Sequence, residues 1–270
     1  MTVGTHDYDL VIVGYNSERF VPRIAEALRD ASHLVGLVFV DNSPTATTIE
    51  AVRTHAWPVE PLTVAAPANP GFGGGVNRGV GALEKASPYL VVANPDLLVR
   101  EEQILAVISE LAEDERRAVG GVQLVTSDGH RVSSARVFPT AQSLAKRRVR
   151  DVDFTARSRE VDWICGAFMV WKREWFDGVG GFDERFFLYF EDVDICRAVW
   201  AAGGLPWAVS GIEVIHDQGH GEETSESLRA ESRASKVIYA RKWLGILGVV
   251  AARWGNAIER TRAGARRILR

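Results

Sequence analysis

The chain has 270 residues, of which 46% are hydrophobic and 25% charged, and its formal net charge is −3. This length and composition predict one sizeable buried core with at most a small appendage. Cys165 and Cys196 lie outside any C-x-x-C spacing, which argues against a disulfide framework and against a zinc site. His6, Asp7 and Asp9 stand where a signal peptide has a basic segment, so we expect a cytosolic protein.

The charge is unevenly distributed along the chain. Residues 229–270 contain eleven Lys and Arg against two acidic residues, a net charge of +9, which leaves −12 on the rest. A basic tail of this kind suits an anionic membrane surface or a nucleic acid.

The first half of the chain alternates apolar runs with helical patterns. This alternation predicts an α/β fold with a mostly parallel sheet flanked by helices, in which ligands bind at the carboxyl ends of the strands. The expected strands are residues 9–15, 37–41, 62–66 and 89–93. The expected helices are residues 18–30, 45–54 and 101–111, and a glycine-rich stretch follows the third strand.

The pattern changes after about residue 118. A helix is expected to begin near Glu191, and a short strand at 212–215 precedes His216. Before them we expect a strand at residues 119–125 and a turn at 127–129. A mobile basic loop region at 138–159 and a second strand at 161–171 should follow.

Asn94, Pro95 and Asp96 come directly after the predicted strand at 89–93. A carboxylate there points into the ligand crevice and could bind Mg²⁺ or Mn²⁺, which would neutralise the charge on a departing diphosphate. The same residues are good turn formers, so both interpretations stay open. His216 could complete such a metal site, although a lone histidine is more often structural.

Polar residues also follow the first two predicted strands. The ring of Tyr15 could stack on a base, with Asn16 beside it. Asp41 could accept a hydrogen bond from a ribose hydroxyl or a base imide. Asp41, Asn42 and Ser43 are also good helix caps, which is the commoner role of such residues.

Residues 69–79 (NPGFGGGVNRG) look like a dinucleotide-binding fingerprint, but the spacing fails. The pattern G-x-G-x-x-G finds Val76 when begun at Gly71 and Arg78 when begun at Gly73, which disfavours a nicotinamide-dependent dehydrogenase. No G-K-[ST] follows, so a P-loop is excluded. We expect a loop that brings the backbone close to a ligand before a helix, with Asn77 and Arg78 within reach of a diphosphate.

Glu191, Asp192 and Asp194 form an acidic cluster at the start of a predicted helix. Acidic residues are favoured at helix N-termini for electrostatic reasons. Alternatively, one carboxylate removes the proton from an acceptor hydroxyl, as inverting sugar transfer requires. The sequence does not separate these explanations.

Taken in this order, the motifs resemble family 2 glycosyltransferases with a GT-A fold, and most closely their rhamnosyltransferase branch. The resemblance runs from about residue 9 to residue 221, and its order and spacing are more specific than any single motif. The motifs are VIVGYNS, VDN, NPGFGGGVNRG, ANPD, CGAFMVWKREWF, GGFDERFFLYFEDVDICRA and HDQGHG.

The resemblance implies an inverting, metal-dependent single displacement on a Rossmann-like GT-A domain. Asp96 and His216 match the metal site, and Asp192 matches the general base, with Glu191 beside it. Many relatives have Asp-x-Asp where this chain has Asn94-Pro95-Asp96, so we expect the ion to bind together with the donor diphosphate. The positions that match nucleotide-sugar-binding residues are Tyr15, Asn16, Asp41, Asn69, Gly71, Phe72, Asn77, Asn94, Trp163 and Gly166.

Size and tail further resemble the actinobacterial members of this branch, which build the linker between peptidoglycan and arabinogalactan in cell-wall biogenesis. The resemblance implies dTDP-L-rhamnose as donor and a polyprenyl-diphosphate-linked N-acetylglucosamine as acceptor. One alternative is another donor, UDP-galactofuranose or UDP-N-acetylglucosamine. A second is a nucleotide-binding, membrane-associated scaffold without catalysis.

We expect a GT-A domain at residues 1–221, with a donor half at about 1–117 and an acceptor half at about 118–221, and a helical tail at 222–270. The apolar stretch at 243–254 is shorter than the roughly 20 residues that span a bilayer. On a helix, Trp243, Leu247, Val250, Trp254 and Ile258 share one face, and Arg253, Arg260 and Arg267 fall on another.

This pattern predicts an amphipathic helix at an interface, and hence a peripheral protein on the inner face of the cell membrane. The alternative is that the apolar face packs on the catalytic domain or on a second subunit, as in a homodimer. Nucleic-acid binding is disfavoured, because the cations accompany an apolar face and no recognition motif appears. Lys146, Arg147, Arg148 and Arg150 could cradle the acceptor diphosphate or form a solvated loop.

Overall fold

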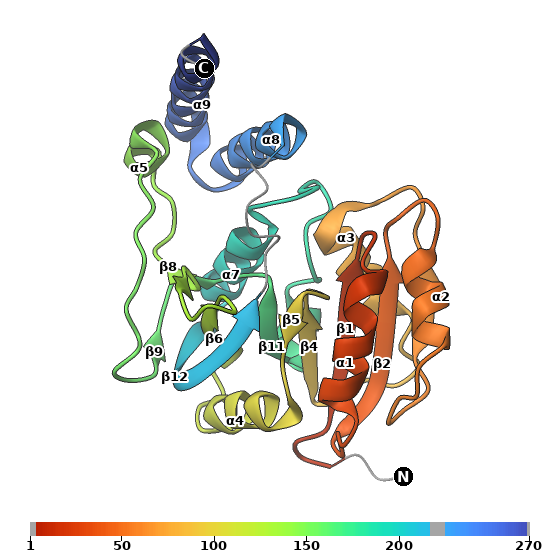
Figure 1. Ribbon diagram of the computed structural model, residues 1–270. Coiled ribbons are helices and arrows are strands. Elements are labelled where there is room, and N and C mark those ends of the chain that lie inside the picture. The colour runs from red at the N-terminus through yellow and green to blue at the C-terminus, as the bar shows by residue number, and fades with distance from the viewer. Residues whose placement is uncertain (1–3, 217–224, 269–270) are drawn as a thin grey trace.

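The computed structural model describes residues 4–216 and 225–268, with side chains up to residue 261. The expected domain boundary at residues 221 and 222, and the side chain of Arg267, lie outside the described residues. The described chain begins below the sheet, and the helical tail lies above the sheet (Figure 1).

One large sheet forms the centre of the molecule and confirms the expected mostly parallel α/β architecture. In spatial order the strands are β3 (Leu62–Ala65), β2 (Leu34–Asp41), β1 (Tyr8–Gly14), β4 (Tyr89–Ala93), β11 (Phe168–Lys172), β6 (Arg117–Val125), β12 (Leu205–His216) and β5 (Leu97–Leu98). β11 runs antiparallel to its neighbours β4 and β6, and β5 runs antiparallel to β12, whereas the other neighbours in the main path are parallel.

Short strands extend this arrangement. β7 (Arg131–Val132) pairs with β6, and β9 (Arg159–Glu160) pairs with β12. β8 (Ala135–Arg136) and β10 (Trp163–Ile164) form a separate two-stranded sheet.

Helices cover both faces of the sheet, because the side chains of each central strand alternate between two apolar layers. Leu10 and Ile12 of β1 pack in one buried cluster with Ile24 of α1, and Val11 packs in the other with Val76 of α3. The helices are η1 (Glu18–Phe20), α1 (Val21–Leu28), α2 (Thr47–Arg53), α3 (Gly71–Gly81), α4 (Glu101–Ala112), α5 (Ala141–Lys146), α6 (Arg173–Gly178), α7 (Glu191–Ala201), α8 (Glu226–Trp243) and α9 (Gly245–Ile268).

The glycine-rich segment differs from the expected loop, because it is helical from Gly71 onward. A Cβ atom at Gly79 would lie 2.5 Å from a methyl carbon of Val11, so the missing side chain lets α3 lie close against β1. Gly79 and Gly75, whose Cβ atom would lie 2.7 Å from a methyl carbon of Val13, therefore serve helix–sheet packing, whereas a Cβ atom at Gly71 would meet the carbonyl oxygen of Phe187.

The structure differs from three further expectations. The strand expected at 161–171 is two strands, because β10 pairs with β8 whereas β11 pairs with β4. The loop region expected at 138–159 contains α5, which begins with reciprocal capping bonds between Thr140 and Ser143. The strand expected at 212–215 is the end of the longer β12.

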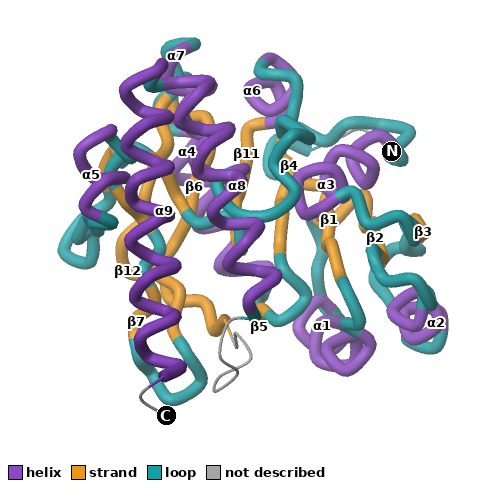
Figure 2. The backbone as a smooth tube through the Cα atoms, turned by 90° about the horizontal axis from the view of Figure 1, so that it is seen from above, coloured by secondary structure: helices purple, strands orange, loops and turns teal. Residues whose placement is uncertain are grey.

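The tail consists of two helices that run side by side (Figure 2). α9 also contacts α5, and a Cβ atom at Gly255 would lie only 2.3 Å from the carbonyl oxygen of Leu144. Among the described residues, no helix combines the length and the apolar character needed to cross a bilayer.

Candidate active site

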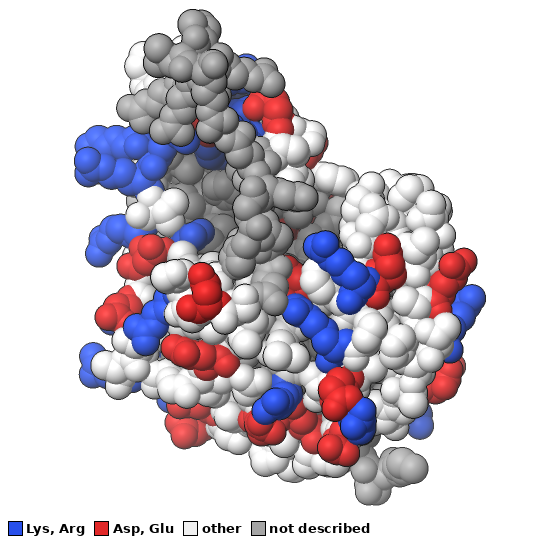
Figure 3. Space-filling model, viewed as in Figure 1, with Lys and Arg blue, Asp and Glu red and all other residues white. Residues whose placement is uncertain are grey.

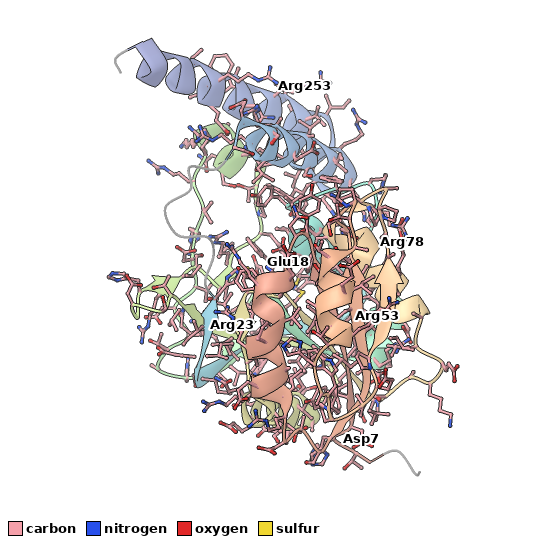
Figure 4. The ribbon with its side chains drawn as sticks, turned by 45° about the vertical axis from the view of Figure 1, so that its right-hand side comes forward. Asp7, Glu18, Arg23, Arg53, Arg78 and Arg253 are labelled. Carbon is pink, nitrogen blue, oxygen red and sulfur yellow. The ribbon has the colours of Figure 1, made fainter. Side chains whose placement is uncertain are left out.

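The carboxyl end of β4 and the end of β12 bring Asp96 and His216 together. Asp96 Oδ1 lies 3.3 Å from His216 Nε2. His216 pairs with Leu97 of β5, and Arg23 of α1 donates a hydrogen bond to the backbone carbonyl of Asp96. Arg23 lies on the side of α1 that faces β12 (Figure 4). Backbone pairing and an arginine thus fix the turn that carries Asp96.

Oxygen and imidazole nitrogen ligands suit Mn²⁺, and a carboxylate with open positions suits Mg²⁺. In the described ranges, no cluster of three or more His, Cys, Asp or Glu side chains could hold a metal ion. Asp96 and His216 therefore fit an ion that takes its other ligands from water and a bound diphosphate.

Asp192 lies at the N-terminus of α7 and accepts two backbone hydrogen bonds. Its Oδ2 accepts from the N–H of Gly166 at 3.0 Å, and its Oδ1 accepts from the N–H of Val193 at 2.8 Å. Tyr189 and Phe190, just before the acidic pair, have φ angles of 67° and 68°. Such backbone is unfavourable for aromatic residues and is found preferentially at functional sites.

Glu191 and Asp192 form a coupled acidic pair. Burial raises the pKa of Glu191 well above its ordinary value, and the charge of Asp192 raises it further. Burial also raises the pKa of Asp192, although its hydrogen bonds with Gly166 and Val193 and the charge of Arg136 act in the opposite direction. Burial therefore raises the pKa of both carboxyl groups, and the N–H groups of Gly166 and Val193 favour the ionised form of Asp192.

A cleft of about 1260 Å³ connects these features. It is lined from the β4 side by Asn94 and from β12 by His216. The N–H of Asn94 donates to the carbonyl of Ala167 at 2.8 Å, next to Gly166, which holds Asp192. The site residues expected from the sequence that line this cleft are Phe72, Asn94, Trp163, Gly166, Glu191, Asp192 and His216.

Asp41 is fully buried, and it accepts hydrogen bonds from the segment that leads into α2, although the N-cap residue of α2 is Ala46 and not Asp41, Asn42 or Ser43. Its Oδ1 accepts from the N–H of Ser43, and its Oδ2 accepts from the N–H of Thr48 at the start of α2, both at 3.0 Å. Tyr15 and Asn16 follow β1, where Tyr15 is 55% exposed and Asn16 has a φ of 50°. None of these three residues lines the cleft.

Residues 69–77, in α3 and just before it, form hydrogen bonds with nearby backbone groups. Asn69 Oδ1 accepts from the N–H of Gly71 at 3.1 Å, and the N–H of Phe72 donates to the carbonyl of Phe187 at 3.1 Å. Asn77 exchanges two hydrogen bonds with the backbone of Phe182, at 2.8 and 2.9 Å. Phe72 and Asn77 thus connect α3 with the loop that leads to the acidic pair, whereas Asn69 holds the first residue of α3.

Arg136 of β8 is a site residue that sequence reasoning missed. Its guanidinium lies 5.2 Å from the ring centroid of Trp163, and its Nε lies 3.0 Å from Asp151 Oδ1. It lines the cleft, and its charge favours the ionised form of Asp192. Its segment has no periodicity that could have distinguished it from other surface arginines.

Residues 6–235 match the protein family described as Glycosyltransferase like family 2. The chain is 27% identical over 257 residues to the N-acetylglucosaminyl-diphospho-decaprenol L-rhamnosyltransferase of Mycobacterium tuberculosis, covering 86% of this chain and 82% of the relative. It is 24% identical over 249 residues to rhamnosyltransferase WbbL of Escherichia coli, covering 86% and 92%.

Solved structures share the fold at lower identity. The mannosyltransferase PcManGT from Pyrobaculum calidifontis, in complex with GDP-Man and Mn²⁺, has a TM-score of 0.60 and 14% identity, covering 96% of this chain and 75% of that one. GalNAc-T7 with UDP, GalNAc and Mn²⁺ has a TM-score of 0.60 and 17% identity over 86% of this chain, which spans about half (48%) of its length. Fold and family agree: the chain is a GT-A glycosyltransferase and belongs to glycosyltransferase family 2.

Proposed function

We propose that this enzyme transfers L-rhamnose from dTDP-L-rhamnose to a polyprenyl-diphosphate-linked N-acetylglucosamine, with inversion and with Mg²⁺ or Mn²⁺, in the synthesis of a cell-wall linker. The names of the relatives from Mycobacterium tuberculosis and Escherichia coli support rhamnose as the sugar. The decaprenol in the name of the first supports a polyprenyl-diphosphate acceptor.

The observation that carries this proposal is the arrangement of two chemical groups along one cleft. Asp192, half-buried and oriented by the Gly166 N–H, lines the same cleft as His216, the partner of Asp96. A base for the attacking hydroxyl, on the same cleft as one member of a candidate metal pair, fits a metal-assisted single displacement at a sugar carbon.

In this proposal Asp192 accepts the proton of the attacking acceptor hydroxyl. A carboxylate whose pKa is raised by burial binds a proton more strongly, which favours general-base action near neutral pH. The N–H groups of Gly166 and Val193 each hold one carboxylate oxygen, and the remaining lone pairs can accept the proton of the hydroxyl. A divalent ion held by Asp96 and His216 would supply positive charge for the leaving diphosphate.

A transfer assay tests the proposal. Purified enzyme is incubated with dTDP-L-rhamnose, Mn²⁺ or Mg²⁺ and a short polyprenyl-diphosphate N-acetylglucosamine, and mass spectrometry follows the product. We expect a mass increase of one deoxyhexose, which EDTA abolishes and Asp192→Asn strongly reduces. Transfer from UDP-galactofuranose or UDP-N-acetylglucosamine but not from dTDP-L-rhamnose would overturn the donor assignment, and no transfer from any of the three would favour a scaffold role.

We further propose that the tail holds the enzyme against an anionic membrane. Ile246, Leu247, Val250 and Trp254 of α9 form an exposed apolar stripe, with Leu247 80% and Trp254 64% exposed. Arg253 and Arg260 are exposed on the same helix, and an apolar face flanked by cations is typical of interfacial helices.

Vesicle co-sedimentation tests this placement. Wild type should bind vesicles that contain phosphatidylglycerol and bind phosphatidylcholine vesicles weakly, and Leu247→Glu with Trp254→Glu should abolish binding. The control is Ala86→Glu, which adds a charge at an exposed position far from α9 in the sequence. If the paired change instead dissociates a dimer in analytical ultracentrifugation and vesicles never bind, the stripe is a subunit interface.

A further inference from the structure

One wall of the cleft is basic. Lys146 at the end of α5, Arg147, Arg148 and Arg150 after it, and Lys236 of α8 all line the cleft that Asp192 lines; these five residues are the basic wall. Lysine and arginine side chains gather at the upper left of the space-filling view, over α5 (Figure 3). The wall lies away from α2 and α3 in both Figure 1 and Figure 2.

The basic wall carries more positive charge than the neighbouring acids neutralise. Glu259 of α9 is shared by Arg147 Nε at 3.7 Å, Lys236 Nζ at 3.6 Å and Arg233 Nη1 at 3.4 Å. Within the described part of the chain, Arg148 and Arg150 form no ion pair with a carboxylate. Burial lowers the pKa of Lys236, and the charges of Arg147 and Arg233 lower it further. This excess of positive over negative charge favours the binding of an anion.

The tail helices hold these cations in place. The reciprocal hydrogen bonds of Thr140 and Ser143 begin α5, and Arg147, with a φ of 54°, ends it. The carbonyl of Leu144 packs directly against Gly255 of α9. Lys236 Nζ donates to Asn256 Oδ1 at 3.1 Å, which fixes it next to Glu259. The wall is therefore partly organised before a ligand arrives, which reduces the entropy cost of binding.

We propose that the basic wall binds the diphosphate of the lipid-linked acceptor and so presents the acceptor sugar to Asp192. The inference rests on the proposed function, because it assigns one part of the acceptor to one part of the cleft. α9 contributes Glu259 to the cleft and carries the exposed apolar stripe, so a charged headgroup and an apolar chain can both be bound along this helix. Arginine and lysine side chains form strong, charge-assisted hydrogen bonds with diphosphate oxygens.

The donor also contains a diphosphate, so the two sources must be distinguished. The candidate metal pair, Asp96 and His216, belongs to the ends of β4 and β12, whereas the basic wall comes from α5, its following loop and α8. The proposal therefore expects separate sites, and loss of the wall should affect acceptor binding and spare donor binding.

Isothermal titration calorimetry tests this without any sugar transfer. Wild type, Arg148→Ala/Arg150→Ala and Arg148→Lys/Arg150→Lys are titrated with farnesyl diphosphate, and separately with dTDP plus Mn²⁺. Arg29→Ala/Arg53→Ala, which removes two exposed arginines from α2 and the end of α1, is the charge-matched control (Figure 4 labels Arg53). Both target arginines are exposed, so the changes leave the core intact.

We expect the alanine pair to weaken farnesyl diphosphate binding by at least about tenfold and to change dTDP binding by less than about twofold. The lysine pair should retain most of the affinity, and the control should behave as wild type. Unchanged farnesyl diphosphate binding in the alanine pair, or equal weakening of dTDP binding, would overturn the proposal.

The same variants separate this inference from the proposed function. In the transfer assay, the alanine pair should raise the KM for the acceptor and leave the KM for the donor unchanged. If wild type transfers no rhamnose but binds farnesyl diphosphate through Arg148 and Arg150, the proposed donor and acceptor fail while the diphosphate site stands. If wild type transfers rhamnose but the acceptor KM does not move, the diphosphate site fails alone.

Discussion

Lys242 Nζ of α8 lies 2.7 Å from Asp194 Oδ2 of α7. The side chain of Asp194 is only 3% exposed, and the indole N–H of Trp243 donates to its other oxygen at 2.7 Å. Ser235 Oγ, also in α8, donates to the carbonyl of Leu188 at 2.8 Å, just before the strained pair Tyr189 and Phe190. The tail therefore braces the turn that carries Asp192.

Lys242→Met should destabilise the protein by about 2 kcal/mol, because it leaves the buried carboxylate of Asp194 without its cation. Urea unfolding measures this change. Arg241→Met, at the exposed neighbouring position, is the control and should stay within about 0.5 kcal/mol of wild type. Equal stability of the two variants would show that the ion pair does not support the fold.

Asp192→Asn should lower kcat by about 100- to 10,000-fold and leave donor affinity unchanged, because the lost group acts on the acceptor proton. Glu191→Gln should retain most of the activity, since glutamine has the same shape and the burial that raises the pKa of Glu191 favours an uncharged side chain there. Steady-state kinetics and calorimetry with dTDP measure both. The reverse ranking of the two variants would move the base to Glu191.

The pH dependence of kcat follows from the raised pKa of Asp192. Activity should fall as pH drops through a value above the ordinary aspartate pKa of about 3.9, because the base becomes protonated there. Arg136→Gln removes a charge that lowers this pKa, so the acidic limb should move to higher pH, whereas Arg136→Lys should leave it near the wild-type position. An acidic limb that does not move with Arg136→Gln would contradict this assignment.

Asp96→Ala and His216→Ala should each weaken the apparent affinity for Mn²⁺ by at least about tenfold, because each removes one of two candidate ligands. The concentration of Mn²⁺ that gives half-maximal transfer measures this. Asn94→Asp restores the Asp-x-Asp pattern and should tighten Mn²⁺ binding, including binding without a nucleotide. Full activity of Asp96→Ala in EDTA would remove the metal from the mechanism.

Gly255→Ala should displace α5, because the new Cβ atom would meet the Leu144 carbonyl oxygen at 2.3 Å. Overpacking of this kind costs about 1–3 kcal/mol. Hydrogen exchange of residues 141–150 should speed up, and farnesyl diphosphate affinity should fall with it. Gly81→Ala is the control, since nothing lies within 4 Å of its added methyl, and unchanged exchange in Gly255→Ala would show that α9 does not hold α5.

The order of strands and helices in the first half could be predicted from the sequence, because each buried strand is a continuous apolar run. The apolar runs next to Tyr15, Asp41 and Asn94 form β1, β2 and β4 in the structure. The insertion of β11 between β4 and β6 could not be predicted, because strand order depends on contacts between residues far apart in the chain. The same is true of α3, because the close approach of β1 explains Gly75 and Gly79, and the backbone of Phe187 explains Gly71.

The candidate site was predicted in part. The motif resemblance selected Asp96, His216 and Asp192, and the structure brings Asp96 next to His216 and places His216 and Asp192 on one cleft. The resemblance did not reveal that Asn77 forms hydrogen bonds with the backbone of Phe182, or that the charge of Arg136 lowers the pKa of Asp192. These relationships join segments that have no common sequence pattern.

The sequence by itself indicated the alternating strands and helices of the first half and the side chains that carry useful chemistry, because periodicity and residue type are local properties. Only the tertiary structure decided what each side chain faces. Burial where α7 packs against β10 raises the pKa values of Glu191 and Asp192, and the packing of α5 on α9 turns scattered arginines into one wall of the cleft. Both effects depend on distances in space, which a linear pattern does not contain.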